Sequence, residues 1–90
     1  MPHFALICTD KPGHLDTRKG NRDAHLAYLS DTRCVTFAGP FLSDGAMTGS
    51  LVVIEVPDRA AADAWAANDP YAKAGLFDTV RIEEWKKVVG

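Results

Sequence analysis

The sequence has few cysteines and no cluster of metal-binding side chains. Only Cys8 and Cys34 occur among the 90 residues, far apart and inside apolar stretches, so they are predicted to be free thiols rather than a disulfide. The three histidines recur every eleven residues, and neither a Cys-x-x-Cys pair nor a His-x-x-x-His pair is present. No metal site and no metal cofactor are therefore predicted.

Runs of like charge are also missing. The formal net charge is −2, acids and bases are interspersed, and the only adjacent basic pairs are Arg18-Lys19 and Lys86-Lys87. This pattern argues against a basic face that follows the phosphates of a nucleic acid. No apolar segment approaches the length of a membrane span, and the start "MPHFALICTD" lacks the regions of a signal peptide. We therefore expect a cytoplasmic protein with neither a nucleic-acid nor a membrane partner.

The composition that remains is the ordinary one of a folded domain, with 47% hydrophobic and 24% charged residues. Residues 1–90 are predicted to form a single domain. A chain of this length buries only about 60–65% of its extended-chain surface. Its core is therefore thin, and pairing with a second copy would stabilise it.

Strand-like and helix-like stretches alternate along the chain in the order β-α-β-β-α-β. Strands are predicted at 3–9, 34–42, 50–56 and 77–89, and helices at 15–31 and 59–68, followed by a short helical turn at 69–75. The segment 43–49, "SDGAMTG", has the composition of a hairpin or loop, and the pair Gly39-Pro40 predicts an edge strand or a bulge. Gly20 weakens the first helix by about 1 kcal/mol, so its first turns are expected to be irregular.

This order of elements predicts a ferredoxin-like α+β fold, in which a four-stranded antiparallel sheet carries both helices on one face. The other face of the sheet would then stay bare. An exposed apolar face of several hundred Å² usually marks an interface. We therefore expect a homodimer that forms through the sheet faces and closes into an α/β barrel.

Polar side chains interrupt the apolar stripe of the first predicted helix. At about 100° per residue, three of them fall on the same side as three leucines: Arg18, Arg22 and His25 beside Leu15, Leu26 and Leu29. Two interpretations stay open. Either the arginines extend to solvent while His25 is a hydrogen-bonded, partly buried residue, or all three side chains face a cleft. The second interpretation needs a carboxylate partner for the histidine.

Asp69, directly before Pro70, is a candidate for that carboxylate. An Asp-Pro pair is typical of a helix start, because the carboxylate accepts free N–H groups of the first turn and proline suits the first helical position. The same carboxylate can also orient an imidazole, since a cap is expected to use one oxygen and leave the other free. Asp69 is therefore interpreted as a cap, a site residue or both, and chain distance alone does not show whether it meets His25.

Several blocks of the sequence together resemble the YciI-like (YCII-related) family of small bacterial proteins. They are "NRDAHLAYL", "AGPF", "GSLVVIEV", "ANDPYAKAGLF" and "VRIEEW", and their order and spacing cover nearly the whole chain. The resemblance implies a ferredoxin-like fold that dimerises through its sheets. It also implies a paired site, whose histidine and aspartate are His25 and Asp69 in this sequence. Members of the family are suspected enzymes, most of them without an assigned reaction.

The substrate-binding candidates are Arg18, Arg22, Gly39, Pro40 and Tyr71. The two arginines bind an anionic or enol-like substrate or, equally well, bond backbone carbonyls. The Gly-Pro pair lets a substrate approach the backbone closely, although a bulge alone would explain it. Tyr71 lines an apolar pocket or, more ordinarily, packs in the core.

The first hypothesis is a cofactor-independent enzyme that acts on a small organic molecule. His25 would be the general acid or base, and Asp69 would hold its tautomer. Isomerisation, elimination or lactone opening are reactions that such a pair supports. Ser43 and Ser50 lie outside the strand-to-helix elbow of a nucleophilic serine, so a serine hydrolase is not expected. The alternatives are a non-catalytic dimer that binds a small ligand, and a structural module in which the pair only stabilises the fold.

Overall fold

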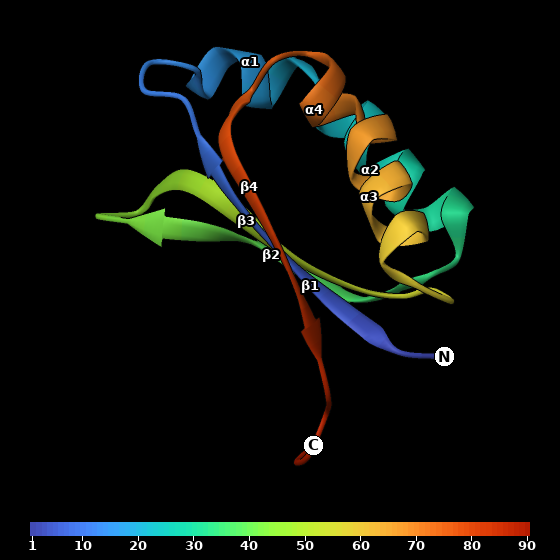
Figure 1. Cartoon of the computed structure of the whole chain (residues 1–90). Coiled ribbons are helices and arrows are strands. Elements are labelled where there is room, and N and C mark those ends of the chain that lie inside the picture. Colours follow the sequence, from blue (N-terminus) through green and yellow to red (C-terminus); the bar gives the residue numbers. More distant parts are fainter.

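Four strands and four helices follow one another through residues 1–90, all of which the computed structural model describes. They are β1 (His3–Asp10), α1 (Leu15–Gly20), α2 (Arg22–Thr32), β2 (Val35–Ser43), β3 (Ala46–Glu55), α3 (Arg59–Asn68), α4 (Pro70–Lys73) and β4 (Phe77–Trp85). The strands form one antiparallel sheet in the order β2-β3-β1-β4. All of the helices lie on one side of this sheet (Figure 1). The predicted ferredoxin-like α+β fold is confirmed.

The first predicted helix is divided in two. Gly20 ends α1, and Asn21 (φ −111°, ψ 6°) lies outside the helical region before α2 begins. Glycine is a poor helix former, so the interruption falls where the sequence is weakest. The two helices therefore do not bury one continuous apolar stripe, as a single helix would. Arg18 of α1 and His25 of α2 are buried, whereas Leu15 and Leu26 are exposed.

The hairpin between β2 and β3 is tighter than the loop predicted for residues 43–49. Only Asp44 and Gly45 turn, both with positive φ (50° and 80°), as a two-residue hairpin turn requires. The remaining residues of that segment extend the two strands. β2 is an edge strand, as the Gly39-Pro40 pair predicted. β4 ends at Trp85, before the predicted end at residue 89.

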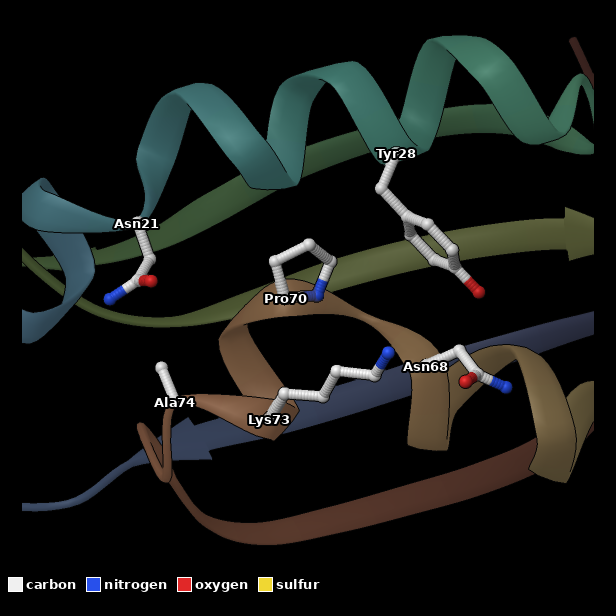
Figure 2. A pocket seen from close by; sticks show the side chains of 6 residues that line it. All are labelled: Asn21, Tyr28, Asn68, Pro70, Lys73 and Ala74. Atoms are coloured by element: carbon white, nitrogen blue, oxygen red, sulfur yellow. The ribbon is translucent and has the colours of Figure 1, made fainter.

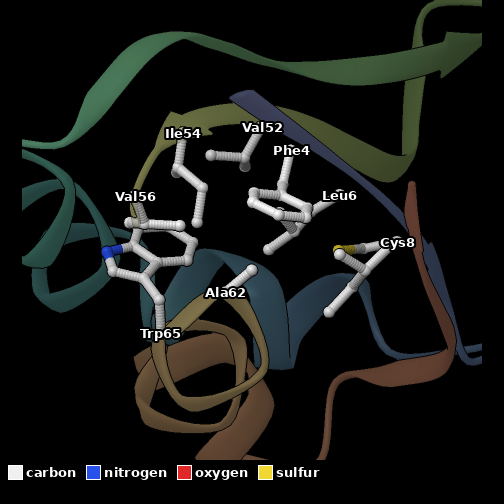
Figure 3. Close-up of a cluster of buried hydrophobic side chains, with 9 residues drawn as sticks. Phe4, Leu6, Cys8, Val52, Ile54, Val56, Ala62 and Trp65 are labelled. Atoms are coloured by element: carbon white, nitrogen blue, oxygen red, sulfur yellow. The ribbon is translucent and has the colours of Figure 1, made fainter. Parts of the chain in front are cut away.

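The apolar core lies between the sheet and α3. α3 begins where the carboxylate of Asp58 accepts the N–H of Ala61, 2.8 Å away. The nine buried core residues are Phe4, Leu6, Cys8, Val52, Ile54, Val56, Ala62, Trp65 and Ile82. Ala62 and Trp65 project from α3 toward the sheet, and Cys8 lies at the end of the cluster away from Trp65 (Figure 3).

An irregular end of β1 carries Asp10. The register between β1 and β4 shifts between Thr9 and Asp10, as at a β-bulge. On the other side of β1, Thr9 pairs with Gly49, where a Cβ atom would collide with the carbonyl oxygen of Cys8. The close approach of the two backbones therefore requires a glycine at this position.

The face of the sheet opposite the helices is not covered by any element. Val52 points to the helices, so its neighbour Val53 and the paired Phe37 face the other way. Phe37 and Phe41 are 44% and 40% exposed. The ring of Phe37 meets that of Trp85 edge to face, with centroids 5.7 Å apart. In this structure no helix combines the length and the apolar character needed to cross a membrane.

Candidate active site

A cavity of about 260 Å³ lies between α2 and the β2-β3 side of the sheet. Its apolar lining comes from Leu26, Leu29, Ala38, Gly39, Pro40, Met47 and Val52, and its polar lining from Arg18, Arg22, His25, Ser50 and Tyr71. Every site residue that was named from the sequence lines this cavity except Asp69, which is buried and in contact with His25. The tertiary structure thus brings together residues that are more than half the chain apart, such as Arg18 and Tyr71.

Asp69 holds one nitrogen of the imidazole of His25. The Nδ1–H of His25 donates to Oδ1 of Asp69 over 2.7 Å, and both side chains are buried. Nε2 has no partner in the protein, and no fully buried side-chain nitrogen or oxygen is left without one, so Nε2 opens on the cavity. This arrangement fixes the tautomer and leaves Nε2 free to exchange a proton with a bound molecule.

The same Asp69 also caps α4. Its Oδ1 accepts the backbone N–H of Tyr71 over 3.0 Å, and Pro70 occupies the first helical position. The sequence predicted that the cap and the imidazole would use different carboxylate oxygens. In the structure, both bonds end on Oδ1.

Tyr71 packs against the imidazole of His25. Its ring stacks on the ring of His25 with centroids 3.9 Å apart and an angle of 12°. The guanidinium of Arg18 lies over the ring of Tyr71, 4.8 Å from its centroid. Burial raises the pKa of the Tyr71 hydroxyl, although the charges of Arg18 and Arg22 act in the opposite sense. Tyr71 therefore both packs in the interior and lines the cavity.

Arg18 is held by a network that the sequence did not reveal. Its Nε and Nη2 donate to the two carboxylate oxygens of Asp10 over 2.7 and 2.9 Å, and Nη2 also donates to Oγ of Ser50 over 2.8 Å. Burial alone would lower the pKa of Arg18, but the hydrogen bond and the charge of Asp10 outweigh it and raise the pKa. A two-pronged contact of this kind fixes the plane of the guanidinium.

Cys8 lies next to these charged groups, and its thiol is unreactive. Burial, followed by the negative charges of Asp69 and Asp10, raises the pKa of its thiol to about 12. Both Cys8 and Cys34 are free, and only Cys8 is fully buried. A thiol that stays protonated is a poor nucleophile, so Cys8 belongs to the packing rather than to the chemistry of the site.

Gly39, Pro40 and Arg22 take different positions at the rim. Pro40 pairs with Ser50, on the side of the sheet that faces the cavity. Gly39 pairs with Leu51, so a side chain at residue 39 would point to the opposite face, where a Cβ would meet no atom within 4 Å. Gly39 thus contributes backbone to the wall. Arg22, unlike Arg18, is exposed.

Asp10 and Ser50 are the site residues that sequence reasoning missed. Alternation along β3 does indicate Ser50, because it is two residues from Val52 and therefore shares its face. Alternation along β1 also places Asp10 in phase with Cys8, at the end of a strand whose pattern was otherwise read only as apolar. Neither residue stands in a recognisable catalytic motif, so spacing alone carried no chemical signal.

A second, wider groove runs over the outside of the helices between α2 and the α3-α4 segment (Figure 2). Asn21, Tyr28, Asn68, Pro70, Lys73 and Ala74 line it. Its polar groups are largely engaged within the protein: the Tyr28 hydroxyl donates to the carbonyl of Trp65, and the Asn68 amide donates to that of Ala64. The cavity that holds His25 is therefore the better candidate for chemistry.

The fold and the cavity together define a small ferredoxin-like α+β protein with a buried His–Asp pair. The model of the YCII-related domain matches residues 2–86, so the chain belongs to this family, as its sequence blocks predicted. It is similar to Protein YciI of Escherichia coli O6:H1 (strain CFT073), with 37% identity over 95 residues that cover 94% of this chain and 97% of that protein.

Two solved structures are similar to this chain, one in both sequence and fold and the other in fold alone. One is 5-chloro-2-hydroxyhydroquinone dehydrochlorinase (TftG) from Burkholderia phenoliruptrix AC1100 in complex with 2,5-dihydroxybenzoquinone. It is 36% identical, with a TM-score of 0.88 and coverage of 93% of both chains. An antibiotic biosynthesis monooxygenase has a TM-score of 0.62 with 15% identity over 99% of this chain and 100% of that one, and it shares the fold alone.

Proposed function

We propose that the protein is a cofactor-independent enzyme that transfers protons on a small hydroxylated ring. The observation that carries this proposal is the state of His25, whose Nδ1 is held by Asp69 while Nε2 opens on the cavity. An imidazole held in this way can take a proton from a ring hydroxyl and deliver it to a ring carbon. The result is a tautomerisation, and no further cofactor is needed for it.

A leaving group on the ring converts this tautomerisation into an elimination. Once a chlorine-bearing ring carbon has gained a proton, loss of a second hydroxyl proton pushes an electron pair through the ring and expels chloride. The balance is two hydroxyl protons lost, one proton gained at carbon and one chloride released, which is net loss of hydrogen chloride. The similarity to a solved dehydrochlorinase supports elimination over isomerisation or lactone opening.

The cavity supports a substrate of one ring. Its volume of about 260 Å³ is smaller than that of pockets for drug-sized ligands. Leucine, methionine, valine and proline side chains supply apolar walls. Arg18, Arg22, Ser50 and Tyr71 contribute donors, and His25 contributes the acceptor Nε2. No carboxylate is among the lining residues, which favours an electron-rich or anionic ligand.

Replacement of His25 by Ala tests this function. We expect turnover of 5-chloro-2-hydroxyhydroquinone, followed as chloride release, to fall about 10²- to 10⁴-fold because the proton carrier is gone. Exchange of ring hydrogens for deuterium in D₂O, followed by NMR, measures the proton transfer without a leaving group. Asp69→Asn should lower both rates by a smaller factor, since the imidazole remains.

His14→Ala is the matched control, because His14 lies before α1 and does not line the cavity. Its rates should equal those of the wild type. Unchanged rates in a folded His25→Ala protein would refute the catalytic role. Binding of the ring without exchange or chloride release in the wild type would instead favour the non-catalytic ligand-binding protein.

We also propose that two copies pair through the uncovered face of the sheet. Phe37 and Phe41 expose aromatic surface there, and a chain this small gains stability from covering it. Light scattering should give twice the mass of one chain, and Phe41→Lys should lower it toward the monomer. Leu15→Lys, at an exposed leucine on the helical side, serves as the control. A monomeric wild type would refute this pairing.

A further inference from the structure

Ser50 presents a hydroxyl group to the cavity from the floor of the site. It lies on β3, opposite Cys8 of β1 and Pro40 of β2, and it is only 3% exposed. Its side chain is among those that line the cavity. A buried side-chain polar atom normally has at least one hydrogen-bond partner, and a hydroxyl group can donate one bond besides those that it accepts.

Only the oxygen of Ser50 is engaged within the protein. Oγ accepts a hydrogen bond from Nη2 of Arg18 over 2.8 Å. A guanidinium has no acceptor, so Arg18 cannot take the serine hydrogen in return. No other hydrogen bond involves the Ser50 side chain, and the hydroxyl hydrogen is therefore available to a molecule in the cavity.

The cation behind Ser50 makes its hydroxyl a stronger donor. Asp10 holds the guanidinium of Arg18 through two bonds of 2.7 and 2.9 Å, so the charge is fixed in place rather than mobile. A hydroxyl that accepts from a cation is polarised, and its own hydrogen then binds more strongly to an acceptor, above all to an anion. The chain Asp10–Arg18–Ser50 ends in the cavity.

The rest of the lining suits a negatively charged ligand. Besides Ser50, the polar side chains are Arg18, Arg22, His25 and Tyr71. The two arginines and Tyr71 can donate a hydrogen bond, and Nε2 of His25 does so once it carries a proton. Asp10 and Asp69 lie close by, but each is already bonded to a cavity residue and neither lines the cavity. An oxygen anion is therefore the acceptor that this cavity is built to receive.

We infer that Ser50, polarised by Arg18, binds the ionised oxygen of the substrate ring as a phenolate or enolate. This inference deepens the proposed function and rests on it only for the identity of the ring. Ser50 would hold the ionised oxygen at the sheet while the imidazole of His25 meets a ring carbon. The substrate class is then a hydroxylated ring that is held as its anion, formed either before binding or when His25 takes the hydroxyl proton, and not an ether.

Two probes with the same ring separate charge from shape. 2,5-Dihydroxybenzoquinone ionises in neutral buffer, whereas 2,5-dimethoxybenzoquinone has no hydroxyl to ionise. Titration calorimetry should show that the wild type binds the dihydroxy compound at least about 10-fold more tightly. In Ser50→Ala, its affinity should fall about 10- to 100-fold, with little change for the dimethoxy compound. Ser43→Ala, in the exposed β2-β3 hairpin, should match the wild type.

Three outcomes overturn the inference about Ser50. The first is that the wild type binds the two probes with equal affinity or binds neither of them. The second is a folded Ser50→Ala protein that keeps the wild-type preference. If the alanine variant does not fold, Ser50→Cys replaces it, because a thiol of similar size is only a weak donor. The third outcome is a Ser50→Cys protein that prefers the ionised probe as strongly as the wild type does.

The proposed function fails on a different measurement. It fails when His25→Ala leaves ring deuteration and chloride release unchanged, or when the wild type shows neither reaction. A preference for the ionised probe that depends on Ser50 would stand in that case, and it would describe a binding protein for ring anions.

Discussion

The layer between the sheet and the helices has two ends of opposite character. At the end formed by α3, the buried side chains are apolar, with Ile54 and Ala62 both at 0% exposure (Figure 3). At the end formed by α1, α2 and α4, Arg18, Asp69 and His25 are buried almost as completely, at 3%, 3% and 6%. Two regions of equal burial thus contain entirely different chemistry.

The difference shows which end stabilises the fold. Each Å² of apolar surface removed from water contributes roughly 25 cal/mol, so the apolar end favours folding directly. Buried ion pairs seldom do so, because the loss of hydration offsets most of their attraction. The Arg18–Asp10 and His25–Asp69 contacts are therefore held in place by the apolar end, and we ascribe their presence to the cavity that they border.

Breaking one ion pair gives the largest expected effect on stability. Arg18→Met should lower the free energy of unfolding by about 3–5 kcal/mol, because the carboxylate of Asp10 stays buried without its partner. The double variant Arg18→Met with Asp10→Leu should recover most of that loss. Urea unfolding monitored by tryptophan fluorescence provides the measurement.

The exposed pair Arg59–Asp63 offers a matched control for this experiment. Its nitrogen and oxygen are 3.1 Å apart, and both side chains are 58% exposed. Arg59→Met should change the free energy of unfolding by less than about 0.5 kcal/mol. If the double variant were as unstable as Arg18→Met alone, the Arg18–Asp10 pair would stabilise the fold in its own right, and the contrast between the two ends would fail.

Cys8 stands at the boundary between the two ends, and its thiol gives a smaller, pH-dependent effect. Burial and then the charges of Asp69 and Asp10 raise its pKa from 9.0 to about 12. At pH values between these two, the unfolded chain releases the thiol proton while the folded chain retains it. The contribution of the thiol to the free energy of unfolding is therefore fully present below pH 9. It falls as the pH rises, by about 1 kcal/mol between pH 8 and pH 10.

Urea unfolding at the two pH values measures this loss in the wild type and in Cys8→Ala. Burial also raises the pKa of Tyr28 and of Tyr71, so part of the fall above pH 10 belongs to them. The variant should therefore lose about 1 kcal/mol less than the wild type over this range. An equal loss in the two proteins would show that the pKa of the Cys8 thiol is not raised in the folded protein.

The elements of the fold were largely predictable, because their signals are local. α3 matches its predicted range, since an alanine-rich segment behind a capping aspartate needs no distant partner to be helical. The break at Gly20 and the short β2-β3 turn were harder to place. Both depend on how the flanking segments pack, which residue preferences do not describe.

The site was predictable only in part. The Asp-Pro pair indicated a cap at Asp69 by its own chemistry, and the structure has that cap. The contact between Asp69 and His25 joins residues 44 positions apart, and only the family resemblance connected them. Asp10 and Ser50 carried no motif at all, although alternation places each on the inner face of its strand.

The amino-acid sequence by itself determined the order of strands and helices, the cap at Asp69 and membership of the YCII-related family, because each of these rests on neighbouring residues or on whole blocks. Only the tertiary structure decided that one carboxylate oxygen serves both a helix and an imidazole, and that Arg18 joins Asp10 to Ser50. The physical reason is that hydrogen bonds are directional and short, so they depend on where distant segments meet.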